Sequence, residues 1–297
     1  MRLRETAVLW VVYQILGGAL PARAGTPIEE TVSASPDGHV RIDNLSGTVR
    51  IEGWDRDEIS ITGTLGDGAE GVDVDRDENE VVIEVVLPSR SRNVDATDLE
   101  IRVPRRSSLG VGTVSAGVEI LGVEGSLEIE TVSGTIGVHG SGGPLEARSV
   151  SGAIDAAGEF SRVEAETVSG DIVVEDARGA LVAGTTSGEI DVRGGVFDEV
   201  RCSSLSGPLR FEGSPSDGAD WEIENFSGPT LLVLPGDVNV HLDVEVFSGS
   251  LRNDFGGELR RPEHGPGGSL STTIGSGDPE AEISVNSFSG SVEIQRK

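Results

Sequence analysis

The sequence predicts an all-β protein that folds as a parallel β-solenoid, and three observations lead to this prediction. An eight-residue phrase of the type Thr-Val-Ser-Gly-x-Ile-x-Val recurs with its serine at Ser133, Ser151, Ser169 and Ser187, each 18 residues after the last. Apolar and polar residues alternate on both sides of each phrase, which is typical of half-buried strands. Residues of one kind also recur at the same position in every round, as a stack of coils with a constant cross-section requires.

Each round of about 18 residues is expected to hold two short strands and two turns. In the round from 126 to 138, Leu127 and Ile129 alternate with two glutamates, Gly134 lies in the turn, and Ile136 resumes the alternation. Glycine takes positive φ without steric cost, so we expect it to form the turn in each copy. The expected turn glycines are Gly47, Gly134, Gly152, Gly170, Gly188, Gly207, Gly228, Gly249 and Gly290.

The inward positions of successive rounds should share one dry, narrow core. An antiparallel meander of hairpins would also place two strands in each round. It does not readily explain why like residues recur at the same position, so the parallel stack is the favoured interpretation. The residues expected in its buried columns include Leu127, Ile129, Ile136, Ile154, Ile172, Ile190 and Cys202.

The chain divides into four predicted parts. Residues 1–24 have a basic start, an apolar stretch and an Ala-Arg-Ala ending, which together indicate a secretory signal peptide. A membrane anchor is the alternative, but the apolar run is shorter than the ~20 residues that a spanning helix needs. We expect a linker at 25–35, an N-terminal β cap at 36–108, and the solenoid at 109–297 with an irregular loop at 253–280.

Charge and length limit the partners. The net charge is −28, which repels nucleic acid and anionic lipid surfaces. No stretch after the signal peptide is apolar for long enough to span a bilayer. We therefore expect an exported protein, located in the periplasm, at the cell surface or in the medium, whose partner is a protein or a ligand of the envelope surface.

The repeated phrase, written x-[Val/Phe]-Ser-Gly-x-[Ile/Val/Leu]-x-[Val/Ile], resembles that of the bacterial putative-adhesin family of unknown function. The segment Leu99-Glu-Ile-Arg-Val-Pro104, which leads into the first regular turn, adds to the likeness. The resemblance covers residues 36–297. It implies a right-handed β-helix-like solenoid and supplies no catalytic residues.

The sequence shows no catalytic constellation, and we expect neither enzymatic activity nor a cofactor. The four histidines are far apart in sequence, and no two have the spacing of metal ligands. Cys202 occupies a column otherwise filled by isoleucine and alanine, which predicts a buried structural thiol. Carboxylates near the turns of successive coils form either an acidic stripe that binds Ca²⁺ or a solvated charged edge: Asp155, Asp171, Glu189 and Asp191.

The favoured functional interpretation is a non-catalytic, adhesin-like or structural rod of the cell envelope. A polysaccharide-active β-helix enzyme is the alternative, and such enzymes need paired carboxylates and often aromatic platforms for sugar. The chain beyond residue 24 has no tyrosine, and most of its aromatic residues are predicted to face inward, which argues against sugar stacking. A scaffold or sensor in envelope stress signalling is a third possibility on which the sequence is silent.

Overall fold

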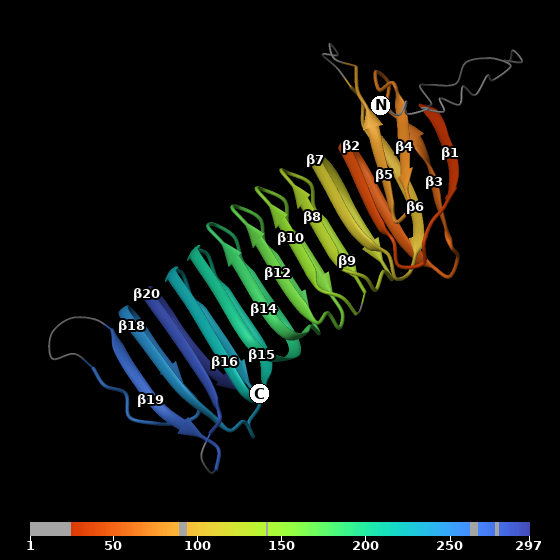
Figure 1. Cartoon of the computed structure of the whole chain (residues 1–297). Helices are drawn as coiled ribbons and strands as arrows, with labels where there is room; N and C mark the ends of the chain where they lie inside the picture. Colours follow the sequence, from red (N-terminus) through yellow and green to blue (C-terminus); the bar gives the residue numbers. More distant parts are fainter. Residues whose placement is uncertain (1–24, 89–93, 141, 262–266, 277–278) are drawn as a thin grey trace, which may run out of the picture.

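The computed structural model describes residues 25–88, 94–140, 142–261, 267–276 and 279–297, and it is a long stack of β-coils (Figure 1). The predicted signal peptide at 1–24 lies outside the described residues. No helix in the described part of the chain is long and apolar enough to cross a membrane. One sheet connects all the strands, and most of its pairings are parallel.

The middle of the stack consists of regular coils of two strands each. The first strands are the beginning of β7 (Ser108–Leu121), β8 (Leu127–Thr131), β10 (Leu145–Ser149), β12 (Arg162–Thr167) and β14 (Arg178–Thr185). Between them lie β9 (Ile136–His139), β11 (Ile154–Ala157) and β13 (Ile172–Glu175). Leu127 pairs with Leu145, and Ile136 pairs with Ile154, in parallel and in register. The parallel solenoid is therefore correct, and the antiparallel meander is wrong for these coils.

Beyond β14 three strands are longer, because each runs through a turn without a break: β15 (Ile190–Ser206), β16 (Leu209–Ser227) and β18 (Val240–Asn253). Between β16 and β18 lies the short strand β17 (Thr230–Leu234). The first residues of β15 pair with β13 and its later residues pair with β14. The core widens here, and Phe197, Phe211 and Trp221 pack together with ring centroids 4.9–6.3 Å apart.

Both ends of the stack contain a strand that is out of chain order. At one end β2 (His39–Trp54) lies between β7 on one side and β5 (Glu80–Val86) and β6 (Thr97–Pro104) on the other. At the other end β20 (Ala281–Arg296) lies between β18 and the pair formed by β16 and β17. Figure 1 shows each of these strands inside the stack rather than at its tip.

These ends differ from the sequence-based expectation in three places. The expected cap at 36–108 includes β2, which is a coil of the stack itself. The expected linker at 25–35 contains β1 (Thr26–Ser33), which pairs antiparallel with β3 (Glu58–Leu65). The expected loop at 253–280 contains β19 (Gly268–Ile274), which pairs antiparallel with β18. The 18-residue spacing does not predict these strands, because the chain leaves the regular stack at both ends and returns to it later.

Antiparallel strands cover both ends. At the N-terminal end β4 (Gly71–Asp77) pairs with β5, and β3 pairs with β6. At the C-terminal end β19 covers the first half of β18. The core runs between these covers without interruption, and all of the predicted core residues are buried: Leu127, Ile129, Ile136, Ile154, Ile172, Ile190 and Cys202.

The turn glycines are explained by close packing more than by positive φ. Of the nine, only Gly47 and Gly228 have positive φ. At Gly152 an added Cβ would lie far inside van der Waals contact with the carbonyl oxygen of Gly134 in the coil before. The same holds at Gly170 against Gly152. This close approach favours glycine at the turn, although Ala116 occupies the equivalent position between Gly47 and Gly134.

Candidate binding groove along the stack

The residue just before each Ser-Gly turn faces solvent. Thr131 points into the stack, where its Oγ1 accepts a hydrogen bond of 3.0 Å from the Gly134 N–H. Ser149 and Thr167 make the same bond to Gly152 and Gly170. Because side chains alternate along a strand, the next residue, Val132 in this coil, points outward.

This outward position is apolar in nearly every coil. Val114, Val132, Val150 and Val168 are each 45–47% exposed. Their backbones are joined coil to coil, since the Ser133 N–H donates to the Val114 carbonyl and the Ser151 N–H donates to the Val132 carbonyl, both at 2.9 Å. The result is an apolar line with one interruption, here called the ridge, formed in stack order by Leu45, Val114, Val132, Val150, Val168, Leu205, Phe226, Phe288 and Phe247.

The ridge holds nine of the eleven exposed large apolar side chains in the described residues. Its polar gap is Thr186, which occupies the position in the coil between Val168 and Leu205. With coils about 4.8 Å apart, the ridge is roughly 43 Å long. Exposed apolar surface concentrated in this way marks an interaction site more often than scattered exposure does.

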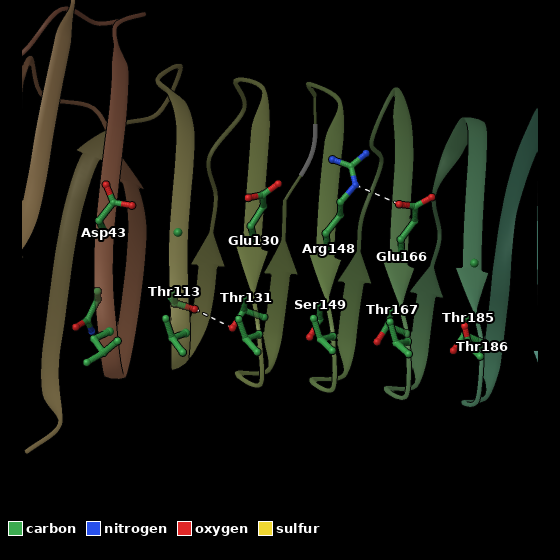
Figure 2. Close-up of a pocket in the computed structure, with 18 of the residues that line it drawn as sticks. Asp43, Thr113, Glu130, Thr131, Arg148, Ser149, Glu166, Thr167, Thr185 and Thr186 are labelled. Carbon is green, nitrogen blue, oxygen red and sulfur yellow. Dashed lines mark hydrogen bonds and ion pairs between the residues drawn. The ribbon is translucent and has the colours of Figure 1, made fainter.

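A groove lies beside the valines of the ridge. It has a volume of about 870 Å³ and is lined by the ridge from Leu45 to Val168 and by outward residues of the same strands. Figure 2 shows Glu130, Arg148 and Glu166 on successive strands, and Asp43 on β2, along one wall of the groove. The hydroxyls of Thr113 and Thr131, 2.9 Å apart, lie at its base.

The acidic wall of the groove contains one cation. Arg148 forms ion pairs with Glu146, with Glu164 at 2.7 Å and with Glu166 at 3.1 Å. Because these carboxylates surround it, the guanidinium is neutralised within its own coil and its neighbour. Among the described residues that line the groove, Asp43, Glu84, Glu130 and Glu166 are acidic and Arg148 alone is basic.

Aromatic residues replace the valines at the C-terminal end of the ridge. The rings of Phe226 and Phe288 stack with centroids 4.7 Å apart, and those of Phe288 and Phe247 stack at 4.9 Å, both nearly parallel. Phe247 is 69% exposed. A second pocket of about 1010 Å³ lies here, and its charged lining residues are Glu224, Glu245, Arg260 and Arg261.

The three exposed phenylalanines differ from the sequence-based expectation that most aromatic residues face inward. Phe197, Phe211 and Trp221 are indeed buried, but Phe226, Phe247 and Phe288 face solvent. The alternation contained the necessary signal. A polar residue that faces inward before the turn, such as Asn225 before Phe226, forces the following side chain outward.

The four carboxylates of the proposed calcium stripe do not converge. Asp155 and Asp191 lie two coils apart with Val173 between them. Asp191 is mostly buried and pairs with Arg193 at 2.7 Å. Asp171 and Glu189 are neighbours, and an Asp171 carboxylate oxygen accepts a hydrogen bond from the Glu189 N–H at 2.9 Å. Within the described residues, no three His, Cys, Asp or Glu side chains gather as a metal site would require.

Cys202 lies in the core between Ala183 and Ile223 of the adjacent coils. It is 1% exposed. Burial raises the pKa of its thiol from the ordinary 9.0 to about 12, because the thiolate would lose its hydration. The thiol therefore has the character of a packing group and not of a nucleophile.

Comparison with known proteins agrees with the repeat and the fold. The Toastrack DUF4097 family matches residues 38–295. The chain belongs to this family. The function of the family is unknown. None of the curated proteins compared with this chain matches the chain.

Several solved structures of the same kind cover nearly the whole chain. Two are described as putative adhesins, one from Parabacteroides distasonis and one from Bacteroides fragilis, with TM-scores of 0.43 and 0.42. Each is 10% identical and covers 91% of this chain and 97% of its own. A third, described as a putative cell adhesion protein from Clostridium sporogenes, is 12% identical, covers 92% of this chain and all of its own, and has a TM-score of 0.25. At these identities and scores the likenesses carry no argument about function.

Proposed function

We propose that this protein is a non-catalytic, exported binding protein of the cell envelope that holds an elongated partner along its ridge. The observation that carries the proposal is the ridge itself. A solenoid needs apolar residues only at its inward positions, yet in this chain one outward position is apolar in nine of ten successive coils. Exposing these side chains costs solubility, so a partner that covers them is the reason for their presence.

The distribution of charge along the groove supports a binding role. In the described residues the groove carboxylates are spread at coil spacing along one wall, and the nearest cation is held in ion pairs. Such an arrangement is suited to contacts distributed along a long partner.

Site-specific photo-crosslinking tests the binding role. A photoactivatable residue at Val150, on the ridge, is compared in the exporting bacterium with one at Asp155, which lies on β11 and does not line the groove. We expect a discrete adduct from position 150 and none from position 155. Equal labelling at both positions, or none at either, would contradict the proposal.

Two further measurements test its other parts. Recovery of the protein from the envelope fraction with Gly25 as its first residue is expected if residues 1–24 form a cleaved signal peptide. A screen on pectin, alginate and other polysaccharides is expected to show no turnover. Turnover that is lost when one carboxylate is substituted would refute the non-catalytic role.

A further inference from the structure

The groove beside the valines has two parallel walls of different chemistry. One wall is the valine part of the ridge, from Leu45 to Val168. The other is the row of outward residues two positions earlier in each coil, among them Asp43, Glu130 and Glu166. An occupant must therefore present apolar groups to the valine wall and positively charged or hydrogen-bond-donating groups to the acidic wall.

We propose that this groove binds an extended polypeptide segment in which apolar side chains alternate with lysine or arginine. This inference rests on the proposed binding function and names the chemistry of the partner. In an extended chain successive side chains point to opposite sides, so alternation places one kind against the valines and the other against the carboxylates. The groove need not supply hydrogen bonds to the backbone of the segment, because the backbone N–H and C=O groups of the segment can bond to water.

The charge of the groove selects a cationic partner. Its described lining carries four carboxylates and one guanidinium, a net charge of three negatives. Glu166 is paired with that guanidinium at 3.1 Å, and Asp43 is paired with Arg41, outside the lining, at 2.9 Å. The whole chain has a net charge of −28, which steers cationic segments toward it and repels nucleic acid and anionic lipid. A second copy of the chain carries the same charge and the same acidic wall, so it is a poor occupant.

The length of the groove sets the length of the segment. The lining residues come from eight successive coils, from Glu84 to Ser203. At about 4.8 Å per coil this span is roughly 34 Å, which an extended chain covers with about ten residues. The coil spacing does not match the side-chain repeat of a strand, so the groove favours a composition and not one fixed sequence.

Fluorescence anisotropy with synthetic peptides tests the inference on the protein without residues 1–24. The probe is a dye-labelled peptide of about twelve residues in which lysine and valine alternate, long enough to fill the groove. One control peptide replaces lysine by glutamate, and another replaces valine by serine. We expect binding of the first peptide to be at least about tenfold tighter than binding of either control.

Variants locate the site. The ridge variant Val132→Thr, Val150→Thr, Val168→Thr removes apolar surface at exposed positions and should weaken binding about tenfold or more. The wall variant Glu130→Gln, Glu166→Gln should weaken it about threefold at low salt and flatten its salt dependence. The control variants are Val196→Thr, an exposed valine off the ridge, and Asp155→Asn, Glu189→Gln, which removes the same charge elsewhere. Both controls should change the dissociation constant less than about twofold.

Three results would overturn the inference. The first is equal loss of binding in the wall variant and in the Asp155→Asn, Glu189→Gln control, which would mean attraction by total charge only. The second is no preference for the lysine–valine peptide. The third is a dimer in sedimentation that the ridge variant abolishes, which would make a second copy the occupant. If the peptide fails while crosslinking at Val150 still gives an adduct, the binding role stands and only the partner chemistry is wrong.

Discussion

The valine part and the phenylalanine part of the ridge share one backbone position but differ in chemistry. In both parts the residue precedes a Ser-Gly turn, and in both the coils are in register. The valines lie beside an acidic wall, whereas the phenylalanines stack on one another and line a pocket whose charged residues are two glutamates and two arginines. The coil thus fixes which positions are exposed, and the residue type decides what each stretch of the rod can bind.

The cores beneath the two parts also differ, with small and aliphatic side chains under the valines and large aromatic side chains under the phenylalanines. Under the valines, small residues such as Ala147 and Ala165 alternate with isoleucine and leucine. Under the phenylalanines, Phe197, Phe211 and Trp221 fill a wider interior. A wider coil needs larger groups inside to avoid voids, since a cavity costs packing energy.

The largest expected loss of stability comes from truncating a side chain in the wider core. Trp221→Ala removes the largest fully buried side chain and should lower the free energy of unfolding by about 3–5 kcal/mol. Ile154→Val, in the narrow core, should lower it by about 0.5–1.5 kcal/mol. Urea denaturation followed by circular dichroism measures both. Equal losses would mean that the two cores are packed alike.

The next largest loss of stability is expected at the turn glycines, which both parts of the ridge share. Gly152→Ala places a Cβ against the Gly134 carbonyl and should cost about 1–3 kcal/mol, because adjacent coils must move apart. Gly137→Ala is the matched control, since its added Cβ would lie 3.9 Å from the nearest atom, the Val118 carbonyl oxygen. Melting temperatures of the two variants compare them. A Gly152→Ala protein as stable as the control would show that the coils tolerate the added atom.

Cys202, close to the boundary of the two cores, predicts a dependence on pH. Its thiol pKa is raised to about 12 in the folded protein against 9.0 ordinarily, so the unfolded chain loses the proton first as pH rises. Stability from this group is complete below pH 9 and falls between 9 and about 12, by about 1.4 kcal/mol per pH unit. Urea titrations at pH 8 and pH 10 should show a larger loss for the natural protein than for Cys202→Ala. In addition, a thiol reagent should label Cys202 only on unfolding.

The stacked rings predict a smaller difference on the surface. Phe288 lies between Phe226 and Phe247, so Phe288→Ala loses two stacking contacts and should cost about 1–2 kcal/mol. Val150→Ala, at the same position in the valine part, should cost less than about 0.5 kcal/mol. Chemical denaturation of both variants gives the comparison. Equal costs would mean that the phenylalanines contribute only exposed surface.

The smallest expected effect is that of calcium. Asp155 and Asp191 are two coils apart, and Asp191 is held by Arg193. We therefore expect millimolar Ca²⁺ to leave the melting temperature within about 1 °C and to release no heat beyond dilution in calorimetry. A saturable heat that Asp171→Asn removes would instead support the calcium stripe.

The sequence allowed the middle coils to be predicted in detail, because constant spacing and alternation identify both partner and face for residues such as Leu127 and Ile136. The two ends could not be predicted in this way. Asn44-Leu-Ser-Gly47 carries the phrase, but its partner coil begins at Ser108, after four intervening strands. The local sequence pattern does not indicate that β2 pairs with strands that come much later in the chain.

The candidate site was predictable only in part. The phrase [Val/Phe]-Ser-Gly was visible, and the inward Thr131 implied an outward Val132. What spacing could not supply was the chemistry of the opposite wall, since Asp43, Glu84 and Glu130 come from three distant segments of the chain. Only the stacking order brings them into one row.

The placement of β20 has a consequence for synthesis and export. This strand emerges after β1 to β19, yet both of its neighbours, β16 and β18, depend on it for their backbone hydrogen bonds. A nascent chain cannot finish this stack by adding coils one after another, so the gap between β16 and β18 stays open until β20 arrives. A product truncated before Ala281 would display two bare edges and invite aggregation or proteolysis, which makes completeness of the polypeptide a condition of its survival.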